Sequence, residues 1–153
     1  MKRTGFKKPT LEEVKEKQRV KKEKDKLKVK VVKKKSESIS SLKKKLWTLF
    51  SLYIRQRDKF TCFTCGKKGE GSGMHAGHFI PKSVGGIALY FHEDNVHAQC
   101  YHCNINLGGS QYIYGLKLGK KAEELYKMKG IYTKWTVEDY KNKIEFYKKQ
   151  NGN

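Results

Sequence analysis

Four cysteines occur as two pairs whose spacing is typical of a zinc site. The pairs are Cys62-Phe-Thr-Cys65 and Cys100-Tyr-His-Cys103, about 35 residues apart. A Cys-x-x-Cys turn places two thiolates on one side of the chain, so two such turns can complete a single tetrahedral zinc site. We therefore expect the four cysteines to hold a structural zinc ion that clamps the ends of the segment between them.

Three polar residues in and just after that segment have side chains suited to phosphodiester hydrolysis. They are His78, Asn95 and Asn104, the last of which directly follows Cys103. A neutral imidazole can accept a proton from water at cytoplasmic pH, which makes His78 the candidate general base. We expect Asn95 to orient the histidine and Asn104 to bind a catalytic metal. This order and spacing are typical of an HNH nuclease site.

Residues 53 to 147 resemble the NinG (Rap) family of phage recombination endonucleases. The residues that carry the resemblance are Cys62 to Gly66, Ala76 to Pro81, Leu89 to Cys100, Cys103-Asn104, Gly108-Gly109, Tyr114 and Gly119. The resemblance implies an HNH, or ββα-metal, endonuclease that cuts branched recombination intermediates such as Holliday junctions and D-loops. It also implies a catalytic divalent metal, Mg²⁺ or Mn²⁺, besides the structural zinc.

The sequence departs from this family pattern in two places. Some relatives carry a further cysteine cluster near the N-terminus, whereas the first 61 residues here contain no cysteine. Many HNH sites have an acidic metal ligand directly before the histidine, and here that position is Gly77. The nearest replacement is His75, which we expect to bind the catalytic metal together with Asn104. Its imidazole would shift the preference toward an ion softer than magnesium.

The charge of the chain indicates a polyanionic partner. The net charge is +20, and residues 1 to 45 hold 19 Lys and Arg against 6 Asp and Glu. Residues 1 to 40 contain too few large apolar side chains for a core, so we expect a basic arm, partly helical or disordered, that binds DNA phosphates. An arm without a specific role is the alternative.

There is neither a long apolar run nor a secretory leader, so we expect a cytoplasmic protein without membrane insertion. In that compartment, paired cysteines favour zinc binding over disulfides.

Residues 41 to 150 are expected to form one small domain. From Ser41 onward Leu42, Leu46, Phe50, Tyr53 and Ile54 recur at helical spacing, with Ser40 or Ser41 as the cap. Met74 to Ile80 is expected to be a strand, Pro81 to Gly86 a loop, Ile87 to Phe91 a second strand, and a helix is expected to begin near Val96. The resulting fold class is α+β, with a zinc-stapled ββα module between helices. Thr136 and Asp139 form a capping box before a last helix that carries Val137, Tyr140, Ile144 and Tyr147 on one face.

Three further residues are candidates for contact with nucleic acid. Arg55 and Arg57 lie at the end of the first expected helix, which Asp58 and the first cysteine pair terminate. They are close to the metal module, where they either contact phosphate or lie in solvent. His97 either faces the site or packs in the interior.

Cutting a symmetric junction would favour a homodimer.

A second class of function accounts for the cysteines and the charge. A non-catalytic zinc-ribbon protein that binds DNA would need both, and His78 and Asn95 would then only pack. The asparagine immediately after the last cysteine argues against it, since a ribbon has no need of that residue. RNA binding through exposed aromatic side chains is a third reading, and the helical spacing of the aromatic residues argues against it.

Overall fold

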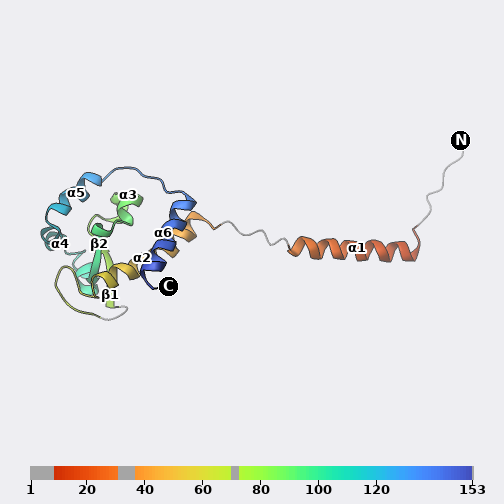
Figure 1. Cartoon of the computed structure of the whole chain (residues 1–153), viewed down its shortest axis with the longest axis horizontal. Helices are drawn as coiled ribbons and strands as arrows, with labels where there is room; N and C mark the ends of the chain where they lie inside the picture. The colour runs from red at the N-terminus through yellow and green to blue at the C-terminus, as the bar shows by residue number, and fades with distance from the viewer. Residues whose placement is uncertain (1–8, 31–36, 70–72, 153) are drawn as a thin grey trace. The chain divides into compact units, whose positions relative to one another are not determined.

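The computed structural model describes residues 9–30, 37–69 and 73–152 (Figure 1). The chain divides into two compact units, residues 1–36 and 37–153. The first unit contains helix α1, Leu11–Lys30, which begins at Thr10: its hydroxyl accepts from the Glu13 N–H, and the Glu13 carboxylate accepts from the Thr10 N–H. This reciprocal pair satisfies two N–H groups that a helix start leaves open.

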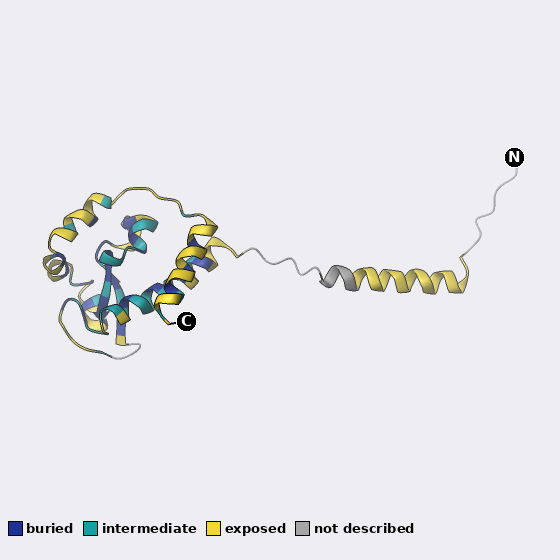
Figure 2. Ribbon diagram, in the orientation of Figure 1, coloured by how far each residue is buried: buried dark blue, intermediate teal, exposed yellow. Residues whose placement is uncertain are grey.

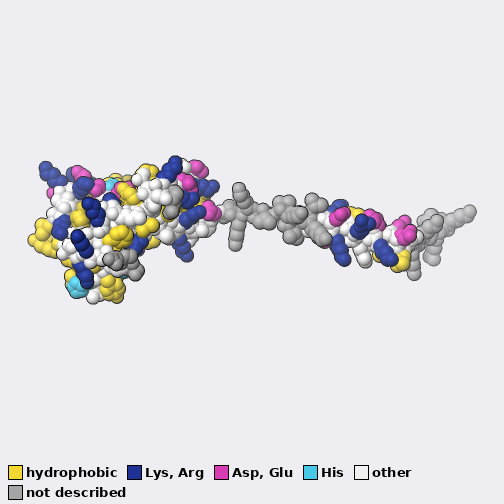
Figure 3. Space-filling view, turned by 60° about the horizontal axis from the view of Figure 1, so that its bottom comes forward, with side chains coloured by type: hydrophobic (Ala, Val, Ile, Leu, Met, Phe, Trp, Pro, Cys, Tyr) yellow, Lys and Arg dark blue, Asp and Glu magenta, His cyan; other side chains and the backbone are white. Residues whose placement is uncertain are grey.

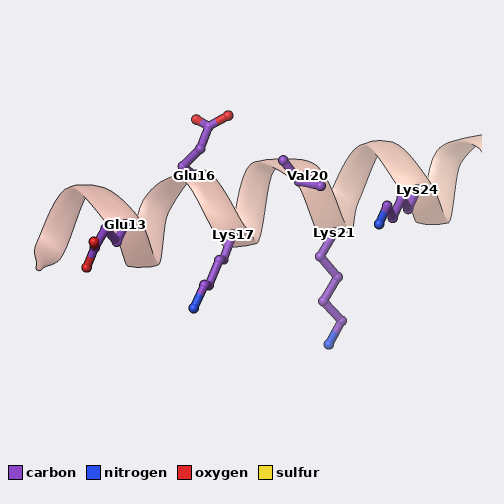
Figure 4. A pocket seen from close by; sticks show the side chains of 6 residues that line it. All are labelled: Glu13, Glu16, Lys17, Val20, Lys21 and Lys24. Carbon is purple, nitrogen blue, oxygen red and sulfur yellow. The ribbon is translucent and has the colours of Figure 1, made fainter. Parts of the chain in front are cut away.

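Helix α1 is exposed wherever its side chains are described, from Leu11 to Asp25 (Figure 2). A shallow hollow runs beside it, lined only by side chains of this helix, namely Glu13, Glu16, Lys17, Val20, Lys21 and Lys24 (Figure 4). Five of these six residues are charged, and among the described residues no second element contributes to the hollow. It therefore provides no enclosed binding site. Among the described residues, no helix is both long and apolar enough to cross a bilayer.

Two long helices form the main core of the second unit. Helix α2, Ile39–Arg57, packs against α6, Val137–Gln150, in a cluster of mutually buried side chains. The members from these helices are Leu42, Leu46, Phe50 and Ile54 of α2, and Tyr140, Ile144 and Tyr147 of α6. The predicted apolar faces of both helices are therefore confirmed except at Val137, which is exposed, and Tyr53 is only partly buried. The Thr136–Asp139 capping box is also confirmed. The first helix begins earlier than expected, because the cap is Ser38, whose hydroxyl accepts from the Ser41 N–H.

A two-stranded antiparallel sheet lies against α2. Strand β1, Met74–His78, pairs with β2, Val96–Cys100, so that His75 faces Gln99 and Gly77 faces His97 across the ladder. The side chains of β1 alternate between the two faces of the sheet. Ala76 and His78 lie on the side of α2, where His78 contacts Trp47. His75 and Gly77 lie on the opposite side.

Three predicted elements between the cysteine pairs are wrong. Pro81 to Gly86, expected as a loop, and Ile87 to Phe91, expected as a strand, both lie mostly in helix α3, Lys82–Tyr90, which is kinked at Gly86 where φ is 63°. Val96, expected to open a helix, instead begins β2, directly after the short 3₁₀ turn η2, Glu93–Asn95. A short apolar run does not distinguish strand from helix by its periodicity, which accounts for the wrong strand.

The remaining elements complete an α+β fold. A single-turn π-helix, η3, His102–Asn106, follows β2 directly, so two strands precede a short helical segment. Helices α4, Gln111–Leu118, and α5, Lys120–Met128, meet at Gly119, which has a φ of 57°. They cover a second apolar cluster, whose members are Phe79, Ile80, Leu89, Tyr114, Leu118 and Leu125.

Candidate functional site

The four cysteines lie together, as the sequence predicts. Their sulfur atoms all lie within 4.8 Å of one another, and the Sγ atoms of Cys65 and Cys100 are 3.8 Å apart. A tetrahedral zinc ion with bonds of about 2.3 Å places its sulfur ligands about 3.8 Å apart. Met74 of β1 is buried beside three of these cysteines. The cluster could therefore hold a structural zinc ion and would tie the first knuckle to the end of β2.

Backbone turns bring the first cysteine pair into place. Gly66 has a φ of 77°, a conformation that costs glycine little, and its N–H donates to the Cys62 carbonyl. Burial raises the pKa of Cys62, but hydrogen bonds from the Cys65 N–H and the Thr64 hydroxyl outweigh it and lower the pKa to about 6. The thiolate of Cys62 is thus stabilised near neutral pH. The thiolate is the form of cysteine that binds metal.

His78 lies at the end of β1 in an aromatic enclosure. Its ring stacks on Trp47 with centroids 5.2 Å apart, and Nε2 lies 3.0 Å from the Tyr90 carbonyl oxygen. A carbonyl only accepts, so Nε2 carries the proton and Nδ1 keeps the lone pair. Burial lowers the pKa of His78 to about 4, the nearby charge of Lys82 adds to this, and the hydrogen bond to Tyr90 only partly offsets it. The imidazole is therefore neutral at pH 7.

Asn95 is fully buried and links the loop after β1 to the end of α3. Its Oδ1 accepts from the Ile80 N–H at 2.7 Å, and its Nδ2 donates to the carbonyls of Ile80 and Leu89 at 3.2 and 2.9 Å. The hydrogen bonds of its side chain are thus with the backbone and not with the imidazole. Since Leu89 directly precedes Tyr90, Asn95 positions the carbonyl that binds His78. Asn95 acts on the histidine through the loop.

Asn104 and His75 meet on the other side of β1. The Asn104 Nδ2 lies 3.2 Å from His75 Nδ1. Asn104 lines two adjoining hollows, one with His78 and Gln111 and the other with His75 and Arg55, and both also include Ala76 and Lys82. One surface depression along the edge of β1 therefore reaches His75, His78 and Asn104.

Gly77 leaves room for two oxygen atoms. A Cβ built at this position would collide with Gln99 Oε1 and lie 2.8 Å from Asn104 Oδ1. Gln99 is fully buried and its Nε2 donates to the Gly109 carbonyl at 2.8 Å. The oxygen donors here suit a hard divalent cation such as Mg²⁺ or Mn²⁺, so the residues present are compatible with a catalytic metal.

Arg57 and His97 belong to an internal polar network. Arg57 donates to Asp58 and to the carbonyls of Glu93 and Val96, and the Nδ1 of His97 lies 3.2 Å from Asp58 Oδ2. The His97 ring also stacks on Phe63 with centroids 4.0 Å apart. Burial raises the pKa of Asp58, but hydrogen bonds involving His97, Arg57 and the Ala98 N–H lower it to about 2. This network joins α2 to β2, and contact of Arg57 or His97 with nucleic acid stays a prediction.

Arg55 takes a different position from Arg57. It lies on the rim of the depression beside Ser51, whose carbonyl accepts from Arg55 Nε at 3.0 Å. Lys and Arg side chains are scattered over the visible face of the second unit and do not gather in one band (Figure 3). On this face, charge alone therefore does not mark a path for a polyanion.

Sequence reasoning missed four residues around the site. Trp47 and Tyr90 enclose His78, Asp58 anchors β2, and Gln99 points its oxygen toward Gly77. The aromatic pair was recognisable only as apolar, because its contact with His78 depends on how α2 and α3 pack. Gln99 lies directly before Cys100, and no spacing rule distinguishes it from a solvent-facing residue.

Comparison with known proteins gives one family. Residues 1–152 match the sequence model of the family described as bacteriophage lambda NinG protein. Protein ninG of Escherichia phage lambda is 30% identical to the chain over 103 residues, which is 63% of this chain and 50% of the phage protein. The chain thus spans about half the length of this curated relative. No solved structure matches the chain.

Proposed function

The chain belongs to the NinG family of bacteriophage proteins, and on that basis we propose that it is a metal-dependent DNA endonuclease of phage recombination. Its proposed substrates are branched DNA molecules such as Holliday junctions or D-loops. The observation that carries the proposal is a neutral, buried histidine at the edge of a depression that also contains Asn104 and His75. Imidazole, carboxamide and a cationic side chain at one surface are the groups that phosphodiester hydrolysis requires.

In this proposal His78 is the general base. The Tyr90 carbonyl holds Nε2–H, so Nδ1 is the atom that accepts a proton from the attacking water. Trp47 and Tyr90 restrict the ring and exclude solvent from its faces. The fixed tautomer and orientation remove a reorganisation cost at the moment of proton transfer.

Lys82 would attract the phosphate, and a bound metal ion would neutralise its charge. Lys82 is exposed and lines both hollows, so its ammonium group can attract a phosphodiester into the depression. His75 and Asn104 are the residues that would hold a divalent cation. When bound, such an ion neutralises the charge that grows on the phosphate and on the leaving oxygen.

A cleavage assay tests the proposal. Labelled four-way junction, matched linear duplex and single strand are incubated with the full chain in Mg²⁺, in Mn²⁺, and in excess EDTA. We expect junction cleavage with either metal and none with EDTA. DNA binding without cleavage in any metal would contradict the proposal and favour a non-catalytic zinc-containing DNA-binding protein.

A further inference from the structure

Two carboxamide oxygens converge on the same small space over Gly77. The position of a Cβ on Gly77 lies no more than 2.8 Å from either Gln99 Oε1 or Asn104 Oδ1. A carbon atom there would collide, whereas divalent cations take oxygen ligands at about 2.0–2.6 Å. The backbone of β1 thus carries no side chain at Gly77, the position that the two oxygen atoms approach.

The orientation of Gln99 is fixed by its other hydrogen bonds. Its Nε2 donates to the Gly109 carbonyl at 2.8 Å and lies 3.3 Å from the Thr64 hydroxyl. Exchanging the nitrogen and oxygen would put two acceptors face to face at Gly109, so Oε1 must point toward Gly77. The Asn104 Nδ2 lies 3.2 Å from His75 Nδ1, and the Asn104 Oδ1 lies on the side of Gly77.

Among the described residues, Gln99 Oε1 has no hydrogen-bond partner although the side chain is fully buried. Leaving such an acceptor unpaired in the interior is unfavourable. A second acceptor, Asn104 Oδ1, approaches the same position over Gly77. A positive ion bound by both oxygens would remove the penalty on Gln99.

We propose that Gln99 is a ligand of the catalytic cation, supplying its carboxamide oxygen together with Asn104 and His75. The proposal rests on the proposed nuclease function and adds to it a residue that sequence reasoning did not consider. All three side chains are neutral when they bind metal, so the site contributes no negative charge. Such a site binds a divalent ion weakly by itself and leaves the ion's charge available to a DNA phosphate.

Direct measurement of Mn²⁺ binding tests this role without relying on cleavage. Bound Mn²⁺ is measured by electron paramagnetic resonance at millimolar metal on the full chain and on Gln99→Met, which keeps the length of the side chain and removes the oxygen. We expect the substitution to weaken binding at least tenfold. Gln111→Met is the matched control, because Gln111 is exposed in the same depression, and it should bind like the parent. Zinc content and circular dichroism show whether each variant is folded.

A second variant replaces the oxygen from another position. In Gly77→Asp with Gln99→Ala, the shortened residue 99 clears the space and the new carboxylate enters it from β1. We expect this double variant to bind Mn²⁺ at least as well as the parent. Gly77→Asp alone should bind worse than the double variant, because its Cβ collides with Gln99.

Nuclear magnetic resonance of the unsubstituted chain provides an independent test. On titration with Mg²⁺, the side-chain amide resonances of Gln99 and Asn104 should shift in nuclear magnetic resonance spectra, whereas that of Gln150 should not. Unchanged resonances, or equal Mn²⁺ affinity in the parent and a folded Gln99→Met, would overturn the role of Gln99. If the parent nevertheless cuts DNA with metal, the proposed function stands. A parent that neither binds Mn²⁺ nor cuts DNA contradicts both.

Discussion

His78 illustrates how the environment sets the chemistry of a single residue. A histidine in solution is partly protonated near neutral pH, whereas burial between Trp47 and Tyr90 lowers the pKa of His78 to about 4. The ring is therefore neutral over the whole physiological range, and its Nδ1 lone pair is not lost to protonation, while the lowered pKa makes it a weaker base than a histidine in solution. The same shift makes the stability of the domain depend on pH.

That dependence has a definite sign. Between about pH 6.5 and the lowered pKa of about 4, the unfolded chain binds a proton that folded His78 does not. The stabilisation is therefore complete above pH 6.5 and is lost as the pH falls, by about 2 kcal/mol at pH 5. Urea unfolding of the parent and of His78→Gln, which cannot titrate, measures the difference. If the two proteins lose the same free energy between pH 7.5 and pH 5, His78 is not buried in its neutral form.

At the scale of elements, Asn95 links the loop after β1 to the end of α3. Asn95→Ala would leave the Ile80 N–H and the Ile80 and Leu89 carbonyls unpaired in the interior. We expect a loss of roughly 2–4 kcal/mol of unfolding free energy, together with slower cleavage because the Tyr90 carbonyl shifts. Asn106→Ala, at an exposed asparagine, is the control and should change neither quantity. A stable Asn95→Ala with full activity would show that the loop does not need this link.

The cysteine cluster joins the first cysteine pair to the end of β2 and to η3. We expect the purified protein to hold about one zinc ion per chain, and Cys100→Ser to lose the ion and unfold the region around β2, because zinc binding there supplies folding free energy. Metal analysis and circular dichroism check this. A metal-free protein with an unchanged spectrum would contradict it.

The sequence predicted elements where one pattern dominated locally. The apolar faces of α2 and α6, the cysteine pairs and the Thr136 capping box each rest on residues close in the chain. The segment from Ile87 to Val96 was mispredicted, because its helix and strand assignments depend on pairing with β1 and packing under α5. Similarly, the hydrogen bonds of Asn95 and the orientation of Gln99 arise from contacts between distant segments, which spacing does not encode.

At the scale of the whole molecule, charge is distributed over both units. Residues 1–36 hold 16 Lys and Arg against 5 Asp and Glu, and the described side chains of α1 are exposed. A helix of this composition has no apolar face with which to pack and is suited to contact with phosphates.

Deleting residues 1–36 tests the role of this basic segment and keeps Ser38, the cap of α2. We expect DNA affinity to fall uniformly across sequences, and the slope of log affinity against log salt to decrease by about 0.9 for each lost phosphate contact with duplex DNA. Fluorescence anisotropy at several salt concentrations measures both. An unchanged slope would show that the segment does not contact DNA.

The most direct test of the proposed activity is the cleavage rate of His78→Ala on a labelled four-way junction in saturating Mg²⁺ or Mn²⁺. This substitution leaves the cysteine cluster, the basic segment and the net charge in place, so DNA affinity should stay within a few-fold of the parent. The rate should fall roughly a hundredfold or more, the size of a lost general base. His102→Ala, at an exposed residue of η3, should cut at the parental rate. Parental cleavage by His78→Ala, with contaminating nuclease excluded, would contradict the assignment of His78 as the base.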